Sequence, residues 1–231
     1  MKSKIIDAHM HVIPAFYGER NGTLVHACGY GKVRYSIKGN WRPGAKRGER
    51  RVMPPSFINT TTPPEVVLEY MDMAGVDCTV LMQSIMYGQH NEYLADLLKK
   101  YPEKFIAAFA FVDPRKGEDA IDELDFIKDL GLVGVKIEPP DMPFWLDDEK
   151  YDPFWKKMEK LGLFLSVDLG WDSPEHEYNF QIEQLENVIE RFPDMIVLIQ
   201  HLGVSYLWDE KIKSLSFLHY KGPLNLRNIL M

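Results

Sequence analysis

The fold is decided by KFIAAFAFVDP (104–114), GEDAIDELDFIKDLG (117–131) and LVGVKIEP (132–139), which follow one another along the chain. The first and third segments are almost entirely apolar and have the length of buried strands. The middle segment has apolar residues at helical spacing, at Ala120, Ile121, Leu124, Ile127 and Leu130. Apolar strands joined by amphipathic helices are typical of a parallel sheet covered by helices.

The same unit recurs on both sides of this stretch. Further helices are predicted at 62–75, 89–102, 151–162 and 178–193, and further strands at 4–9, 76–85, 163–170 and 195–203. No Gly-x-Gly-x-x-Gly or phosphate-loop pattern follows any of the strands, which disfavours a dinucleotide-binding fold. Six strands in regular βα units therefore predict an α/β fold of the TIM-barrel type, with six of its eight units.

We predict a single domain, residues 1–231. Two segments within it interrupt the alternation of strands and helices. A long insertion, 16–62, follows the first strand, and its segment KVRYSIKGNWRPG (32–44) is expected to form a hairpin. The final segment, 204–231, is expected to complete a helix through FLHY (217–220) where a seventh strand would otherwise stand. An incomplete barrel exposes strand edges and apolar surface, so we expect another copy of the chain to cover the gap.

Composition excludes several classes of protein. The 231 residues are 45% hydrophobic and 26% charged, which is ordinary for a globular domain. A net charge of −7 disfavours a general nucleic-acid binder. No segment has the length of a membrane helix or the form of a signal peptide. The only cysteines, Cys28 and Cys78, suggest no disulfide framework, and a cytoplasmic location is expected.

Polar residues stand at the ends of four predicted strands. They are His9 and His11, Lys136 and Glu138, Asp168, and His201. In a barrel of this type the carboxyl ends of the strands carry the chemistry. A carboxylate within an apolar strand, like Asp168, is costly unless it is paired or bound to a cation. Imidazole and carboxylate groups together predict a divalent metal site, with zinc first and manganese or iron as alternatives.

Simpler interpretations exist for each of these residues. Two histidines two apart are often solvated or satisfied within a core, and a lone His201 is commonly structural. Asp168 alone could pair with Lys136. For Glu138 we favour an internal ion pair with Lys136 over a role as bridging metal ligand or general base.

The insertion reverses the charge of the chain locally. Between residues 31 and 51 basic side chains dominate, with Glu49 as the acidic exception. Arg50, Arg51 and Trp41 are predicted to bind a carboxylate-bearing, planar substrate, together with Lys136 at its strand end. The alternative is a mobile loop whose charges only keep it solvated.

Three segments resemble the amidohydrolase superfamily, specifically its amidohydrolase-related branch: IIDAHMHV (5–12), KLGLFLSVDLG (160–170) and ERFPDMIVLIQHLG (190–203). The resemblance implies that His9 and His11 are metal ligands. It places Asp168 where the branch commonly has a histidine ligand, and His201 where a histidine binds metal or acts as acid and base. The aspartate that the branch carries on its eighth strand has no counterpart here.

The resemblance implies a metal-dependent enzyme that hydrolyses a small carboxylate-bearing compound by means of a metal-activated water. The candidate catalytic residues are His201, Asp168 and Glu138, and Glu138 is included for its position at a strand end rather than for the resemblance. A non-oxidative decarboxylase of aromatic or unsaturated acids is the alternative within the branch. A shortened, weakly active or inactive metal-binding homologue is a second alternative, and a structural protein without a site is a third. We expect a homo-oligomer that binds neither nucleic acid nor membrane.

Overall fold

The computed structural model describes residues 3–20, 22–37, 48–142, 144–169, 181–209, 214–217 and 229–230. The chain forms two compact units. Unit 1 comprises Met1–Phe111 with Leu130–Val133, and unit 2 comprises Val112–Asp129 with Gly134–Met231.

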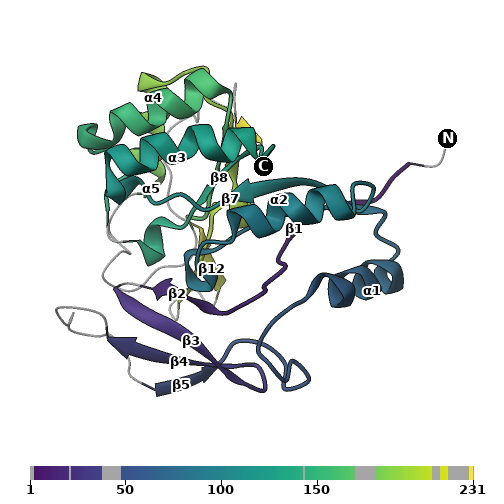
Figure 1. The fold of residues 1–231 in the computed structure, drawn as a ribbon. Helices are drawn as coiled ribbons and strands as arrows, with labels where there is room; N and C mark the ends of the chain where they lie inside the picture. Colours follow the sequence, from purple (N-terminus) through teal and green to yellow (C-terminus); the bar gives the residue numbers. More distant parts are fainter. Residues whose placement is uncertain are drawn as a thin grey trace. The chain divides into compact units, whose positions relative to one another are not determined.

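Unit 1 contains a parallel sheet in the order β1 (Ile6–Met10), β6 (Cys78–Leu81) and β7 (Phe105–Ala110). Helices α1 (Pro64–Ala74) and α2 (Asn91–Lys100) follow β1 and β6 along the chain, with the short helix η1 (Ile85–Tyr87) before α2 (Figure 1). Helix α1 starts with proline and ends at Gly75, whose φ of 71° suits glycine. The three strands and both helices agree with the sequence prediction.

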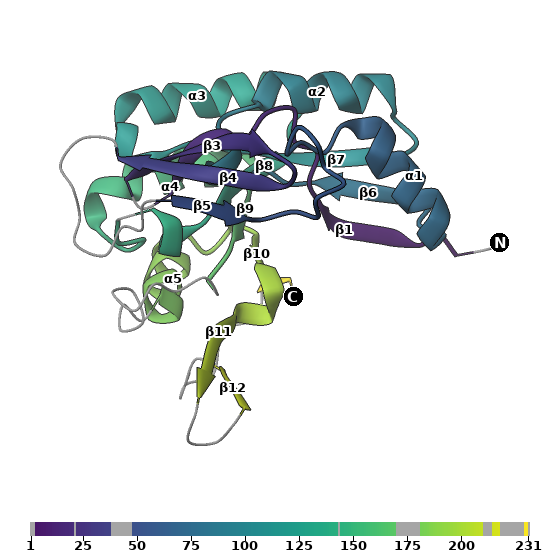
Figure 2. The same ribbon diagram turned by 90° about the horizontal axis from the view of Figure 1, so that it is seen from below.

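The insertion folds as a second, antiparallel sheet in unit 1. Its order is β2 (Tyr17–Arg20), β3 (Thr23–Gly29), β4 (Lys32–Ile37) and β5 (Gly48–Arg51), and β3 to β5 run side by side in Figure 2. The expected hairpin within 32–44 was wrong in its extent, because the strand that pairs with β4 after the turn begins only at Gly48. Strand β4 pairs with β3 on its other side.

This antiparallel sheet is anchored by its own apolar cluster. Val25 and Val33 from the sheet pack with Ile13 and Phe16 from the segment that follows β1, and all four are buried. The described part of the insertion is therefore a folded sheet packed against the segment that follows β1, and it is not a solvated loop.

Unit 2 contains the parallel strands β8 (Gly134–Ile137), β9 (Phe164–Val167) and β10 (Val197–Ile199), in that order. Its helices are α3 (Glu118–Asp129), α4 (Asp152–Leu161) and α5 (Gln181–Arg191), with short 3-10 helices η2 (Pro114–Lys116), η3 (Pro139–Asp141), η4 (Glu149–Tyr151) and η5 (Gln200–Gly203). These positions also agree with the prediction.

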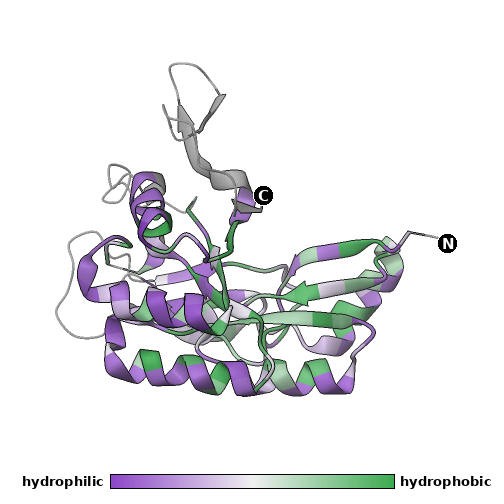
Figure 3. Cartoon of the chain, turned by 90° about the horizontal axis from the view of Figure 1, so that it is seen from above, coloured by the Kyte–Doolittle hydropathy of each residue, from purple (hydrophilic) through white to green (hydrophobic). Residues whose placement is uncertain are grey.

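Packing in unit 2 follows the amphipathic pattern of its helices. Trp155 of α4 is fully buried and donates its indole N–H to the Leu146 carbonyl at 3.1 Å. Figure 3 shows hydrophilic and hydrophobic residues alternating along the helices.

Among the described residues, no helix combines the length and apolar character that crossing a membrane requires.

The last segment differs from the expectation. Strands β11 (Val204–Asp209) and β12 (Ser214–Phe217) form an antiparallel pair, and β13 (Ile229–Leu230) runs parallel to β10. The predicted helix through 217–220 was wrong at Phe217, which ends a strand; residues 218–220 lie outside the described part. A short parallel strand thus stands beside β10, although we expected no seventh strand from the sequence.

Candidate metal centre

His9 and His11 converge in unit 1 at the carboxyl end of β1. Their Nε2 atoms lie 3.0 Å apart, with the rings edge to face. Two nitrogen ligands about 2.1 Å from one metal ion are separated by about 3.4 Å at the tetrahedral angle that zinc prefers, and by about 3.0 Å at the right angle of octahedral coordination. The observed separation therefore fits two adjacent ligands of one ion, and the paired imidazoles fit the donor set of zinc and similar divalent metals.

An irregularity in β1 accompanies this convergence. Between Asp7 and Met10 the strand advances three residues while its partner β6 advances two, from Thr79 to Leu81. Such a shift, as in a β-bulge, redirects a side chain and is common next to active sites. The Asp7 carboxylate accepts the backbone N–H of His9 at 2.9 Å, which stabilises the backbone at this point.

The ring of His11 is held from two sides. Its Nδ1–H donates to the carbonyl of Met82 at 2.9 Å, and the Tyr87 ring packs edge-on against it at a centroid distance of 5.2 Å. Because a carbonyl only accepts, Nδ1 carries a proton, and in the neutral ring the lone pair is then on Nε2. His9 then donates its Nε2–H to His11, and this proton must leave Nε2 for both rings to bind one ion.

Lys136 and Glu138 form the ion pair that we favoured from the sequence. The Lys136 Nζ lies 2.7 Å from Glu138 Oε1, and the side chains are 2% and 10% exposed. Lys136 lies within β8, and Glu138 is the first residue after this strand. Lys136 is in register with Ser166 of β9, so the ion pair lies at the carboxyl ends of the strands in unit 2.

Asp168 and His201 form a second pair in unit 2, after β9 and β10. The His201 Nε2 lies 3.2 Å from Asp168 Oδ2, and the Asp168 side chain is only 1% exposed. His201 has a φ of 52°, a left-handed conformation that costs a non-glycine residue about 1–2 kcal/mol. Such strain persists where surrounding structure imposes it, and it is common at functional sites.

The predicted site residues thus come together as three pairs, one in unit 1 and two in unit 2. Within the described ranges, no group of three or more His, Cys, Asp or Glu side chains is close enough to hold one ion. The set His9, His11, Asp168 and His201 stays a prediction.

Two of the predicted substrate-binding residues, Arg50 and Arg51, lie on β5. Arg50 and Arg51 are exposed, and Arg51 Nη1 donates to the Tyr30 carbonyl at 2.6 Å. Neighbouring Arg34 is held by Glu49 at 2.8 Å, and this contact raises the pKa of the guanidinium and lowers that of the carboxyl. Trp41 lies outside the described residues.

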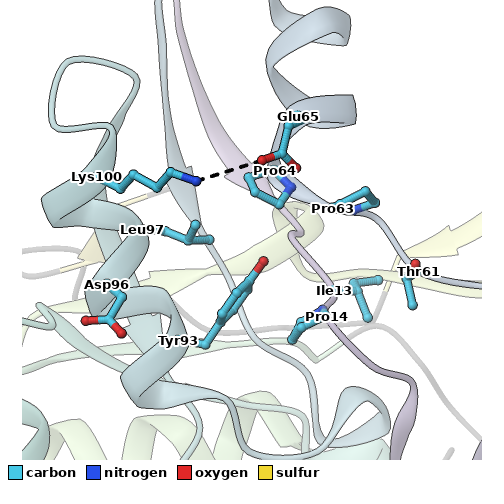
Figure 4. Close-up of a pocket in the computed structure, with 10 residues that line it drawn as sticks. All are labelled: Ile13, Pro14, Thr61, Pro63, Pro64, Glu65, Tyr93, Asp96, Leu97 and Lys100. Carbon is cyan, nitrogen blue, oxygen red and sulfur yellow. Dashed lines mark ion pairs between the residues drawn. The ribbon is translucent and has the colours of Figure 1, made fainter.

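A pocket of about 530 Å³ lies elsewhere in unit 1, between the start of α1 and one face of α2 (Figure 4). Tyr93 and Leu97 line it from α2, and Lys100 pairs with Glu65 across one end at 3.9 Å. Burial raises the pKa of the Tyr93 phenol, so it is protonated near neutral pH. None of the predicted site residues that the structure describes lines this pocket.

The sequence matches the profile of the amidohydrolase family over residues 6–213, which is most of the chain. The chain belongs to the amidohydrolase family. No curated protein matches it.

Solved structures similar to this amidohydrolase support the fold. A probable 2-pyrone-4,6-dicarboxylic acid hydrolase from Acinetobacter baumannii, with citric acid bound, is 18% identical with a TM-score of 0.54, over 87% of this chain and 59% of that one. The 5-carboxyvanillate decarboxylase from Sphingomonas paucimobilis is 19% identical with a TM-score of 0.54, over 65% and 56% of the two chains.

An uncharacterised TIM-barrel protein from Bordetella bronchiseptica is 25% identical with a TM-score of 0.52, over 58% of this chain and 50% of that one. These likenesses confirm the predicted α/β fold of the TIM-barrel type. The present chain spans between 50% and 59% of the length of these three structures.

Sequence reasoning missed the residues that hold His11. Met82 acts through its main-chain carbonyl, which any residue type supplies, and Tyr87 lies in a segment with no predicted element. Their common partner, His11, lies 71 residues from Met82 along the chain, so no local sequence pattern marks either residue.

Proposed function

We propose that this amidohydrolase is a metal-dependent hydrolase of a small carboxylate-bearing organic compound. One observation carries the proposal: the Nε2 atoms of His9 and His11 lie 3.0 Å apart while the Met82 carbonyl binds Nδ1 of His11. A metal-binding histidine characteristically donates its other ring N–H to such an acceptor. Zinc is the first candidate, with manganese or iron as alternatives.

Asp168 and His201 are the further proposed ligands, on the strength of family membership and their positions after β9 and β10. A divalent ion at such a site supplies Lewis-acid polarisation of a carbonyl and lowers the pKa of water toward about 7. The protein's contribution is to orient the substrate, to exclude bulk water and to move protons.

Proton transfer is the role proposed for His201 in place of metal binding. Asp168 contacts Nε2 of His201 at 3.2 Å and so orients the imidazole, which leaves Nδ1 to accept or deliver a proton. If Nδ1 binds the ion instead, proton transfer falls to Glu138. Turnover abolished in Glu138→Gln at constant metal content would assign Glu138 that catalytic role.

Asp168→Ala is expected to weaken metal binding at least about ten-fold and to reduce turnover, because it removes a proposed carboxylate ligand and the partner of His201. Metal content is measured by elemental analysis, and affinity by competition with a chelator. Asp113→Ala is the matched control, because Asp113 is also largely buried and pairs with Arg115 at 2.7 Å. Unchanged metal affinity in Asp168→Ala would contradict its role as a ligand.

Arg50 and Arg51 are proposed to bind the substrate carboxylate, with Lys136 and Trp41 as further members of this set. Arg50→Ala is expected to raise KM about ten-fold with little change in kcat, because a charge-assisted contact to the carboxylate is lost in ground and transition states alike. Arg34→Ala is the control, since Glu49 already engages Arg34. Equal KM values in all three proteins would contradict the assignment.

Decarboxylation is the second candidate reaction, because the pair of Asp168 and His201 is suited to deliver a proton to carbon as well as to oxygen. A panel of aromatic carboxylates assayed for CO₂ release separates it from hydrolysis, assayed as acid release from esters, amides and lactones. CO₂ release alone would overturn the hydrolase proposal, and no turnover of either class would favour an inactive metal-binding homologue.

Homo-oligomerisation stays a prediction, as does the cytoplasmic location. Ile5 and Ile6 at the start of β1 are 56% and 52% exposed, which supports coverage by a second copy. Light scattering measures the state of association, and a monomer at micromolar concentration would contradict it.

A further inference from the structure

A buried polar network lies directly beside the carbonyl that binds His11. Gln83, next to Met82, is 3% exposed, and Asn91 at the start of α2 is 4% exposed. The Gln83 Nε2 donates to Asn91 Oδ1 at 2.5 Å, while Gln83 Oε1 accepts the backbone N–H of His90 at 2.9 Å. The two side chains therefore connect the end of β6 to the start of α2.

Asn91 extends this network to the end of β7. Its Nδ2 donates to the carbonyl of Phe111 at 3.0 Å, and its Oδ1 accepts the N–H of Phe111 at 3.0 Å. On the other side, Met82 donates its N–H to the carbonyl of Met10 in β1 at 2.8 Å. The ends of three consecutive strands are thus joined through hydrogen bonds at the edge that carries His11.

The same network closes the loop that presents Tyr87. The bond from His90 N–H to Gln83 joins the two ends of residues 83–90, and His90 Nε2 contacts the Tyr87 carbonyl at 2.8 Å. Within this loop Tyr87 N–H donates to Ser84 at 3.0 Å. Met82, whose carbonyl binds His11, directly precedes Gln83, and Tyr87 lies within the loop that the Gln83–His90 bond closes.

We propose that Gln83 and Asn91 are positioning residues that set the tautomer and ring orientation of His11, and thereby the metal affinity of the site. The proposal rests on His11 being a metal ligand, as proposed above. Buried, hydrogen-bonded amides are stiff because an unmade hydrogen bond in the interior costs about 1–3 kcal/mol. Outer groups of this kind typically change metal affinity 10–100-fold.

Gln83→Met tests the proposal, because methionine keeps the volume and removes both hydrogen bonds. We expect metal affinity, measured by chelator competition, to fall about 10–100-fold. In the metal-free protein, ¹H–¹⁵N spectra of the histidine rings are expected to show His11 shifting from the Nδ1–H tautomer toward a mixture. A purely structural role would lower stability without moving this signal.

Gln184→Met is the matched control. Gln184 is 5% exposed and accepts the backbone N–H of Leu146 at 2.9 Å in unit 2, so the same substitution removes a comparable buried bond. We expect its metal affinity to stay within about two-fold of the wild type. Should Gln83→Met fail to fold, Gln83→Glu retains the acceptor for His90 and loses donation to Asn91, and the same shift of His11 is expected.

An unchanged His11 tautomer in the Gln83 variant, or equal losses of affinity in the Gln83 and Gln184 variants, would overturn the proposal. Failure of the proposed function is distinguishable: the wild-type protein would then bind no metal, while the spectra of the metal-free proteins would still decide whether Gln83 positions His11.

Discussion

His11→Ala is expected to abolish stoichiometric metal binding and to reduce turnover to background. The substitution removes one of two imidazole nitrogens that lie 3.0 Å apart, and with it the ring that Met82 and Tyr87 hold in place. Removing a hydrogen-bond partner of a metal ligand typically weakens metal binding 10–100-fold. Removing the ligand itself should therefore weaken metal binding by more than about 100-fold.

Elemental analysis of the purified variant, together with chelator competition, measures this loss. His26→Ala is the control: His26 lies on β3, packs against Tyr17 at a centroid distance of 4.8 Å, and belongs to the antiparallel sheet. It should keep the metal content of the wild type. Full metal occupancy in the His11 variant would contradict the metal centre that we propose.

Lys136→Met is expected to lower the free energy of unfolding by about 3–5 kcal/mol, the largest effect on stability that we predict. It removes the cation 2.7 Å from Glu138, whose side chain is only 10% exposed. The remaining carboxylate would be buried without its counter-charge. Urea denaturation followed by circular dichroism measures the change.

Two further variants make this test specific. Lys157→Met removes a pair of the same 2.7 Å length, Lys157 with Asp125, but these side chains are 25% and 54% exposed, so the expected cost is about 0.2–1 kcal/mol. The double variant Lys136→Met/Glu138→Leu replaces both charges and should recover most of the lost stability. Equal costs for the two lysine variants would show that burial does not strengthen the Lys136 pair.

The sequence by itself determined the order of strands β1 and β6 to β10 and of helices α1 to α5. Segments such as 104–139 show a periodic spacing of apolar residues, and glycine and proline mark where helices and strands end. These signals lie within contiguous residues, so they predict the elements without knowledge of the tertiary structure. It also placed His9, His11, Asp168 and His201 at strand ends, because the position of a residue relative to a strand is a local property.

Tertiary structure alone decided how these residues meet. The register shift in β1, the left-handed backbone of His201 and the bond from His11 to Met82 depend on neighbouring strands. The long insertion forms a four-stranded sheet because Val25 and Val33 are buried against Ile13 and Phe16. Contacts between residues far apart along the chain leave no local pattern, so sequence periodicity predicts the strands but not the partners at their ends.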